Sequence, residues 1–447
     1  MNLEISKQEL KDFLLNANDH DFQEMIEFIH PVDLLAIIHE YEDEAVSILN
    51  RLSDEDIAHL LDEEDDEDIY ELLTQFSTKR QKEILEEMSS DEIADFVQAL
   101  DEDESKDVLS KMSKEDVEEV RELLSYPPDT AGGIMATEFI SIHEDKTVKK
   151  TLEYLQGVAQ NAEMAYYLYV TTNEGYLRGV VSLRDLVSSP FNTLISEITN
   201  LNVHSVNVYD DQEEVAKMLD KYDYVMIPVV DEHNLIKGVI TIDDILDIIK
   251  EEATEDIHRM AGLDAEEKVD GTLIESIRSR LPWLSINLIT AILAASVVAM
   301  FSSTIEAVVA LAAINPIIAG MGGNAGTQSL TIIVRGIALG ELTGENARKV
   351  FLKELGVGLC TGVTLGIVVG IGCYFFYGNP YLGFVAGSAM LLNLIIATVS
   401  GYTVPLLLKK CNIDPALASS VFVTTATDVL GFFVFLGLAT ELLPYLI

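Results

Sequence analysis

The stretch from Asn315 to Gln328, NPIIAGMGGNAGTQ, interrupts an otherwise apolar run with one proline and four glycines. Glycine costs about 1 kcal/mol relative to alanine in a helix interior, so we predict that the helix breaks at these glycines. A broken helix at membrane depth is tolerated where the freed backbone groups face protein or a water-filled path. We therefore interpret the stretch as pore lining. The alternative is that the glycines only let two helices pack closely.

The composition predicts two different parts. The chain has 447 residues, a formal net charge of -46 and 49% hydrophobic residues. Most acidic residues precede Arg280, and the part after it is mostly apolar. We therefore expect an acidic soluble part followed by a membrane domain at 277–447. The acidity indicates bound cations, solubility or a salt-adapted organism.

Several classes are excluded. The acidic part would repel the phosphates of nucleic acid, so nucleic acid is not an expected partner. All three cysteines lie in the membrane part, which predicts no disulfide framework and no cysteine metal site. The N-terminus has no apolar signal region, so we expect the acidic part in the cytosol.

Residues 1–128 predict an acidic superhelix of short helices, because an apolar residue followed by a Ser or Asp N-cap recurs at regular spacing. The expected caps are Ser53, Ser77, Ser89, Asp101 and Ser113. Ser89 and Glu92 have the spacing of a capping box. Acidic runs such as 62–68 are either a solvated face or part of a cation site.

An internal repeat follows within 129–252. YYLYVTTNEGYLRGVVSLRDL from Tyr166 aligns with YDYVMIPVVDEHNLIKGVITIDDI from Tyr222, which places Asp185 opposite Asp244. Each copy predicts a strand, a turn, a strand and a helix. The doubled G-x-[VI]-[ST]-x-x-D pattern resembles a tandem pair of CBS domains, an α/β module.

The CBS resemblance implies a candidate nucleotide site. Tyr167, Arg184 and Asp185 would bind the ribose and base of ATP or a related adenine nucleotide, with Tyr224 as a stacking partner. The alternative is that Asp185 only caps its helix.

A polar connecting helix is expected at 253–276, before five membrane spans. Its carboxylates at 251 and 255, and at 252 and 256, share faces and repel each other, so a positive group should lie beside them. The expected spans are 281–301, 305–339, 355–377, 385–408 and 413–445. Basic residues before the first span and after the second and fourth predict a cytosolic N-terminal part and an outside C-terminus.

The last span, SSVFVTTATDVLGFFVF, carries Asp428 near its middle. A central aspartate costs roughly 2.5 to 3.5 kcal/mol on insertion scales and usually marks an ion or proton path. Hydroxyls of Ser420, Thr424, Thr425 and Thr427 surround it in sequence. An all-oxygen site suits a hard cation. The alternative is a structural aspartate bonded to a neighbouring helix.

At this point nearly the whole chain resembles the MgtE-type magnesium channels, through PIIAGMGGNAGTQ, EEATEDIH and TTATDVLG. The resemblance implies a homodimer with a pore on its two-fold axis, where Asp428 holds hydrated Mg2+ with Asn324, glycine carbonyls and Thr424. Val421 departs from the family, where a proline is expected. The resemblance also implies cytosolic Mg2+-sensing carboxylates, at Asp91, Asp95, Glu213, Asp223, Asp244, Asp247, Glu252, Glu255 and Asp256.

We therefore expect a multidomain membrane protein: an all-α helical-repeat N domain, an α/β tandem CBS pair, a connecting (plug) helix and a five-helix transmembrane bundle. The expected function is a plasma-membrane Mg2+ channel for uptake, closed by cytosolic Mg2+, with ATP as a further ligand. A Mg2+ transporter coupled to Na+ or H+ is the alternative. A membrane-anchored adenine-nucleotide sensor is the alternative of another class, and it leaves Asp428 unexplained.

We expect no enzyme, because the sequence has no nucleophile with a base, no phosphate-binding loop and no catalytic zinc spacing. The scattered histidines, among them His204, are interpreted as surface residues.

Overall fold

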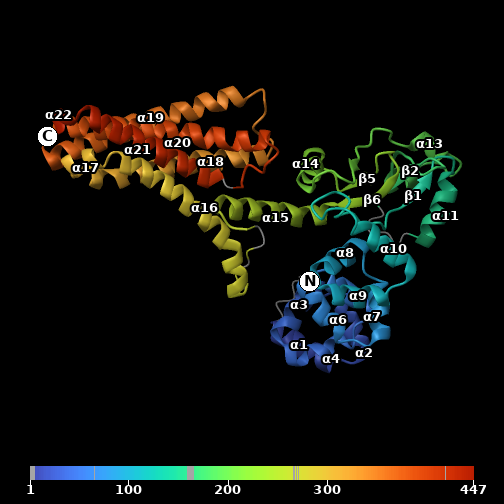
Figure 1. Cartoon of the computed structure of the whole chain (residues 1–447). Coiled ribbons are helices and arrows are strands. Elements are labelled where there is room, and N and C mark those ends of the chain that lie inside the picture. The colour runs from blue at the N-terminus through green and yellow to red at the C-terminus, as the bar shows by residue number, and fades with distance from the viewer. Residues whose placement is uncertain are drawn as a thin grey trace. The chain divides into compact units, whose positions relative to one another are not determined.

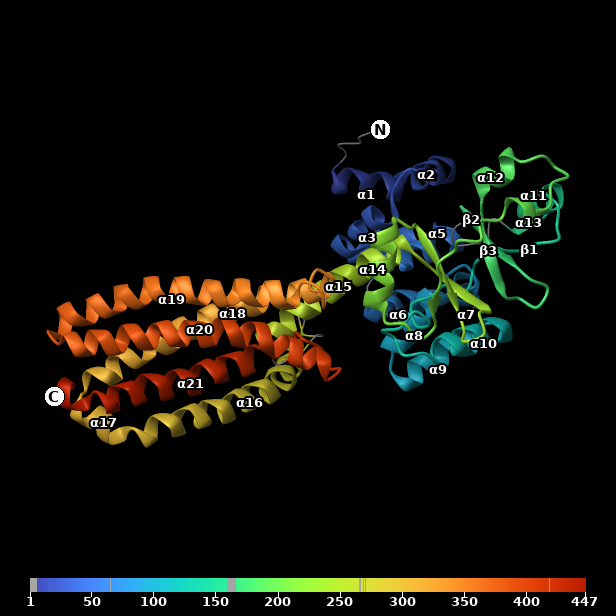
Figure 2. The ribbon, with the colours of Figure 1, turned by 90° about the horizontal axis from the view of Figure 1, so that it is seen from above.

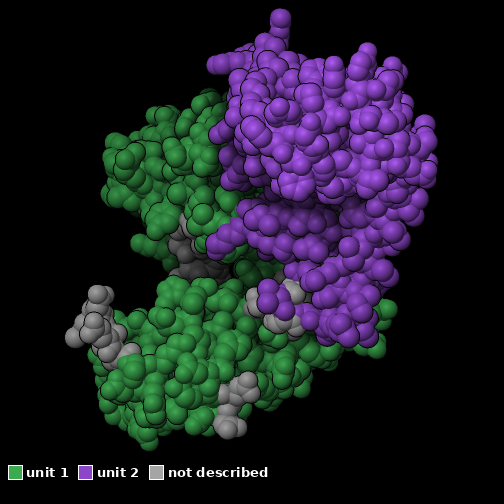
Figure 3. Space-filling view, turned by 90° about the vertical axis from the view of Figure 1, so that its left-hand side faces the viewer, with its two compact units in different colours: residues 1–249 green, residues 250–447 purple. Residues whose placement is uncertain are grey.

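The computed structural model describes residues 6–64, 66–158, 166–264, 267, 269, 271–417 and 419–447. Its chain forms two compact units, Met1–Ile249 and Lys250–Ile447 (Figure 3).

Short helices form the first part of unit 1 (Figure 1). They are α1 (Lys7–Asn16), α2 (Asp19–Ile26), α3 (Pro31–Glu40), α4 (Glu42–Leu49), α5 (Asp54–Leu61), α6 (Asp66–Thr74), α7 (Thr78–Leu85), α8 (Ser90–Ala99), α9 (Glu102–Lys111) and α10 (Lys114–Leu123). Their inner faces share one apolar core that includes the fully buried Phe22 and Phe96. The all-α N domain is thereby confirmed.

The predicted N-caps precede α5, α7, α8, α9 and α10 as expected. The capping box of Ser89 with Glu92 is wrong, because the Ser89 side chain makes no cap hydrogen bond. The Glu92 carboxyl is instead buried among other carboxylates, and both its burial and their charges raise its pKa.

The second part of unit 1 contains two equivalent three-stranded sheets, ordered β1-β2-β3 and β4-β5-β6. The strands are β1 (Ser141–His143), β2 (Tyr167–Thr171), β3 (Leu177–Ser182), β4 (Val206–Asn207), β5 (Met226–Val230) and β6 (Ile236–Thr241). Each sheet has a parallel and an antiparallel pair, and Tyr167 pairs with Ser182 as Met226 pairs with Thr241. This matching register confirms the predicted repeat. The accompanying helices are α11 (Val148–Val158), α12 (Leu183–Ser188), α13 (Ile195–Ile198) and α14 (Gln212–Tyr222).

The connecting segment differs from a helix over 253–276. Helix α15 (Ile242–Ala261) begins directly after β6 and ends before Gly262, whose positive φ of 76° stops a right-handed helix. The next helix, α16 (Leu273–Met300), starts at the N-cap Thr272. Residues 265, 266, 268 and 270 of the expected helix lie outside the described residues.

Unit 2 is a bundle of long apolar helices that run side by side (Figure 2). After α16 come α17 (Ser302–Ala307), α18 (Ala310–Ala338), α19 (Ala347–Tyr377), α20 (Pro380–Lys410), α21 (Ser419–Glu441) and α22 (Leu443–Leu446). Among the described residues, α16, α19, α20 and α21 are long and apolar enough to cross a membrane. The glycine-rich α18 has 29 residues and packs against α20 and α21. Exposed apolar side chains such as Phe375 and Phe376 suit a lipid surface.

Helices α19 and α20 approach each other through glycines. A Cβ built on Gly366 would lie 2.6 Å from the carbonyl oxygen of Gly387, and one on Gly370 would lie 2.9 Å from that of Gly383. Small residues at such spacing let helix backbones touch in a membrane bundle.

Candidate functional site

The glycine stretch lies within one uninterrupted helix, so the predicted break is wrong. A Cβ at Gly322 would lie 2.3 Å from an amide nitrogen of α20, and one at Gly326 would lie 2.6 Å from a valine methyl of α21. A Cβ at Gly320 or Gly323 would meet nothing within 4 Å. Two glycines therefore serve close packing, which was the alternative interpretation, and two lie on an open face. Contacts with the two neighbouring helices offset the low helix propensity of glycine.

The open face of α18 is polar. Asn324, Thr327, Gln328 and Thr331 are exposed, at spacings that place them along one side of the helix. The Thr327 hydroxyl donates a hydrogen bond to the carbonyl of Gly323 at 3.0 Å. A polar strip on a helix of a membrane bundle is unsuited to lipid and requires water, an ion or another protein surface.

Asp428 lies in the middle of α21 and is half-buried. In the described part of the chain its carboxylate has neither a hydrogen bond nor an ion pair. The structure thus gives no support to the alternative of a structural aspartate bonded to another helix. A carboxylate left without a partner in an apolar bundle is suited to bind a cation.

The hydroxyls near Asp428 bond to their own helix. Thr424 donates to the carbonyls of Ser420 and Val421 at 2.8 and 3.1 Å, and Thr425 donates to that of Val421 at 2.6 Å. These bonds use the hydroxyl protons and leave oxygen lone pairs as acceptors. Val421 is buried within a regular helical stretch of α21.

Two buried polar groups in the bundle were missed from sequence. Asn393 of α20 is fully buried and donates from Nδ2 to the carbonyl of Ile318 at 2.8 Å. Glu354 of α19 is 2% exposed and accepts a hydrogen bond of 2.6 Å from the Ser329 hydroxyl. The signal that could have found Asn393 is a lone polar residue inside an apolar span, whereas Glu354 directly precedes the expected span 355–377.

A cluster of carboxyl groups forms in unit 1 around Glu92. The pKa of Glu92 is raised to about 9, mainly by burial and in addition by the charges of Asp91, Asp62, Asp95 and Asp244. The predicted sensor residues Asp91 and Asp95 on α8 and Asp244 on α15 are therefore within electrostatic reach of one group. Glu92 was missed from sequence as a site residue, whereas Asp62, whose pKa burial raises to about 6, begins the acidic run 62–68. Crowded carboxylates of this kind hold either protons or a cation.

Asp244 also bonds to Thr241, the residue directly before its own helix. The Thr241 hydroxyl donates to its carboxylate at 2.6 Å, as Ser182 does to Asp185 in the first repeat. Burial raises the pKa of Asp244 although this hydrogen bond lowers it.

The other predicted sensor residues lie on α14 and α15. Glu213 forms an ion pair of 3.1 Å with Lys217, and Asp223 ends α14 in the left-handed conformation at φ 52°. The remaining ones are on α15, at Asp247, Glu252, Glu255 and Asp256.

The end of α15 is attached to the helix bundle. Arg259 forms ion pairs with Glu255 and with Asp414, which lies between α20 and α21. Met260 packs against the apolar cluster around Leu330 of α18. Arg259 is thus a positive group beside one of the repulsive carboxylates of this helix, Glu255.

The candidate nucleotide residues lie in the two CBS repeats. Tyr167 pairs with Ser182, next to Arg184 and Asp185 at the start of α12. The hydroxyl of Ser182, the N-cap of α12, donates a hydrogen bond of 2.6 Å to the Asp185 carboxylate, and the Asp185 side chain stays exposed.

In the second repeat, Tyr224 belongs to a ring stack that sequence analysis missed. His204 stacks on Tyr222 with ring centroids 4.4 Å apart, and its Nδ1 lies 2.5 Å from the Tyr224 hydroxyl. His204 is therefore not an isolated surface histidine. Tyr222 keeps 40% of its surface exposed, so solvent reaches this aromatic group.

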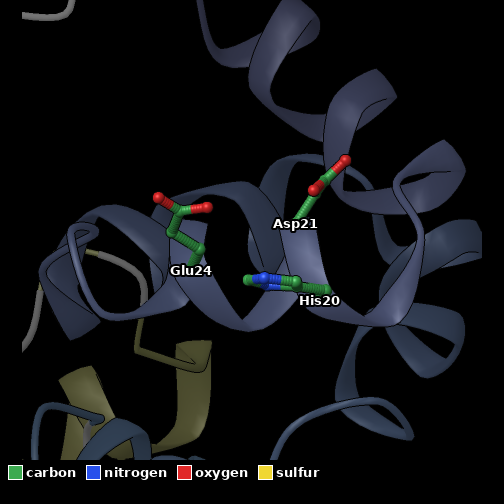
Figure 4. A group of neighbouring side chains, drawn as sticks. All are labelled: His20, Asp21 and Glu24. Atoms are coloured by element: carbon green, nitrogen blue, oxygen red, sulfur yellow. The ribbon is translucent and has the colours of Figure 1, made fainter.

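A second group of potential metal ligands lies on α2. His20, Asp21 and Glu24 offer ligand atoms within 4.8 Å of one another, and all three are exposed (Figure 4). Asp21 also accepts a hydrogen bond of 2.8 Å from Asn18. Exposed acidic groups are common without a bound ion, so this group is not part of the candidate site.

Known proteins match this chain along most of its length. Residues 315–438 match the family model MgtE, described as a divalent cation transporter, and residues 29–129 match the MgtE intracellular N domain. Residues 131–191 and 195–251 match the CBS domain.

Two curated relatives are named magnesium transporter MgtE. The protein of Thermus thermophilus is 40% identical over 73% of this chain and 72% of its own length. That of Enterococcus faecalis is 39% identical over 74% of this chain and 72% of its own. These relatives are transporters, and none of the observations above indicates catalysis.

A crystal structure of the cytosolic domain of the Mg2+ channel MgtE in complex with ATP has a TM-score of 0.51 and 36% identity, and it covers 54% of this chain and 99% of that one. The extent of these matches and the order of the matched domains lead to one conclusion: the chain belongs to the MgtE family of magnesium transporters.

Proposed function

We propose that this protein is a Mg2+-selective channel for magnesium uptake that cytosolic Mg2+ closes. The observation that carries the proposal is Asp428, a carboxylate without a bonding partner among the described residues, in the middle of an apolar helix bundle. Such a group is costly unless it serves an ion path.

The pore forms between two copies of the chain. The exposed polar face of α18, which carries Asn324, favours this arrangement because lipid cannot satisfy it. Mg2+ gives up its water reluctantly, so Asp428 of each copy binds the hydrated ion through water. Asn324 and the oxygen of Thr424 complete the outer hydrogen bonds.

The sensor is the set of predicted carboxylates in the cytosolic part, extended by Asp62 and Glu92. Two unit charges 4 Å apart interact by about 4 kcal/mol at an effective dielectric constant of 20, so an unfilled cluster opposes compaction. Bound Mg2+ neutralises the cluster and favours the closed arrangement. The ions shift the gate only by their higher affinity for the closed form. The end of α15, tied to the bundle through Arg259, transmits the change.

ATP is the proposed second ligand. The relative crystallised with ATP supports it, as do the exposed Tyr167, Arg184 and Asp185 and the aromatic stack at Tyr224. The nucleotide would modulate Mg2+ binding in the cytosolic part.

The proposed location is the plasma membrane, with the N-terminal domains in the cytosol and the C-terminus outside. Basic residues support this orientation, since Arg278 and Arg280 precede the hydrophobic part of α16 while Lys409 and Lys410 end α20.

The test is the Mg2+ current in patches from cells that express the wild type, Asp428→Asn and the control Glu441→Gln at the exposed end of the same helix. We expect current in the wild type and the control, closed by millimolar-range cytosolic Mg2+, and none in Asp428→Asn. Current that persists in Asp428→Asn would refute the pore assignment. Uptake without channel steps that follows the Na+ or H+ gradient would make the protein a coupled transporter.

A further inference from the structure

The side chain of Asn393 is wedged between two helices that flank α20. Its Nδ2 would lie 2.3 Å from a Cβ at Gly322 of α18, and its Oδ1 would lie 2.5 Å from a Cβ at Gly431 of α21. Real Cβ atoms essentially never come so close, so the amide fills space that only glycine leaves on both sides.

The two contacts are next to the candidate pore residues along their helices. Gly322 precedes Asn324 by two residues, and Gly431 follows Asp428 by three. At a rise of about 1.5 Å per residue, each contact lies within one helical turn of its pore residue. The Asn393 amide therefore lies directly against the backbone of α18 at Gly322 and of α21 at Gly431, with no side chain between them.

The bonding of the amide differs at its two ends. Nδ2 donates to the carbonyl of Ile318, which fixes the amide plane against α18. Oδ1 is buried and has no hydrogen-bond partner among the described residues. Gly431 has a hydrogen on its Cα where other residues have Cβ. This hydrogen points toward Oδ1 of Asn393, which is the geometry of a weak Cα–H···O contact.

From this geometry we propose that Asn393 is a positioning residue that sets the separation of α18 and α21 at the level of Asn324 and Asp428. It thereby determines how the pore fits hydrated Mg2+. This inference rests on the proposed pore function. The amide does not touch the ion, and it acts through Gly322 and Gly431.

A size exchange tests this role. Gly431→Ala adds a methyl group that collides with Oδ1, Asn393→Ala removes the amide, and the double variant gives the methyl the vacated space. The full-length protein is reconstituted in liposomes, and Mg2+ uptake yields the half-saturating concentration and the preference over Ca2+. Thermal unfolding of each variant in detergent reports stability separately. The matched control is Gly437→Ala on the same helix, where a Cβ meets nothing within 4 Å.

We expect Gly431→Ala to raise the half-saturating Mg2+ concentration by about 10- to 100-fold, as for loss of groups that orient metal ligands. Gly437→Ala should change nothing. The double variant should return to within about twofold of the wild type, because the colliding atom is gone. Such a rescue cannot arise from two independent losses of stability.

If Gly431→Ala does not fold, the comparison of Asn393→Leu with Asn393→Ala takes its place in the test, since leucine has the same heavy-atom shape as asparagine. Asn393→Leu should keep the preference for Mg2+ over Ca2+, and Asn393→Ala should lose it. A double variant as impaired as Gly431→Ala, or equal Mg2+ preference in the Leu and Ala variants, would overturn the proposal. Unchanged uptake in Asp428→Asn would refute the pore proposal. The Asn393 and Gly431 variants test only the positioning role of Asn393, so the two proposals can fail separately.

Discussion

Replacing Glu92 by glutamine should raise the free energy of unfolding of the cytosolic part at pH 7 by about 3 to 4 kcal/mol. The pKa of Glu92 is raised from 4.5 to about 9, first by burial and then by the carboxylates around it. At pH 7 the unfolded chain has released this proton and the folded chain retains it. The interval between pH 4.5 and 7, at about 1.4 kcal/mol per unit, gives the stated cost. Glutamine is neutral in both the folded and the unfolded state, so the variant does not have this free-energy cost.

The sign of the pH dependence follows from the raised pKa. The folded state binds the proton more tightly than the unfolded state, so the stabilisation is complete below pH 4.5 and is lost as the pH rises through about 9. The wild type should therefore lose stability over this range by up to about 1.4 kcal/mol per pH unit from this group. The Glu92→Gln protein should lack this part of the slope.

Urea unfolding of the first 261 residues, which end with α15, measures both effects at pH 5, 7 and 9 in the presence of a chelator. The cytosolic domain of a relative has been crystallised as a separate chain, which supports the use of this fragment. The control is Glu87→Gln, an exposed glutamate just before the same helix. Parallel pH profiles of the wild type and Glu92→Gln, or a less stable Gln variant at pH 7, would refute the reasoning.

The same cluster predicts proton release on Mg2+ binding. A group with a pKa of about 9 holds nearly one proton at pH 7, and a cation in the cluster would displace it. Calorimetry in two buffers of different ionisation enthalpy counts the released protons. We expect about one proton fewer in Glu92→Gln than in Glu87→Gln. Equal release would exclude Glu92 from the ion site.

Three further outcomes are expected. Gly326→Ala should destabilise the bundle by about 1 to 3 kcal/mol through its clash with α21, whereas Gly323→Ala on the open face should not. Thermal unfolding in detergent compares the two variants, and equal melting temperatures would contradict the packing assignment. Arg259→Gln removes the ion pairs with Glu255 and Asp414 and should weaken closure by cytosolic Mg2+ in patch recordings. Unchanged closure would show that these contacts do not couple α15 to the gate. Tyr224→Ala should reduce ATP binding in calorimetry by loss of stacking, and unaltered binding would place the nucleotide elsewhere.

Features set by local chemistry were predictable from the sequence. The two CBS repeats follow from β-branched runs and from a Ser or Thr three residues before an aspartate. In both repeats this hydroxyl donates a hydrogen bond of 2.6 Å to the carboxylate of the aspartate. Asp428 was identifiable because a lone carboxylate in an apolar span has few explanations. Such inferences need no knowledge of which helix packs against which.

Features set by tertiary contacts were not predictable. Glycine content predicted a break in α18, but the neighbours that keep it helical, Asn393 and a valine of α21, come from distant parts of the chain. Glu92 was interpreted as a capping residue because its neighbours Asp62 and Asp244 are remote in sequence. His204 gave no signal, since its ring partners, Tyr222 at the end of α14 and Tyr224, lie far along the chain from it.

The two proposed ion sites use the same carboxylate chemistry in opposite surroundings. A pore must release its ion quickly, and a single carboxylate per copy that acts through water, as proposed for Asp428, binds weakly enough to do so. A sensor must change affinity when the protein changes shape, and a crowded cluster such as that around Glu92 does this because its repulsion depends steeply on distance. Because this cluster also binds a proton near neutral pH, acidification should weaken Mg2+ sensing. The gate would therefore need a higher cytosolic Mg2+ concentration to close at pH 6 than at pH 8, and current recordings at these two values test it.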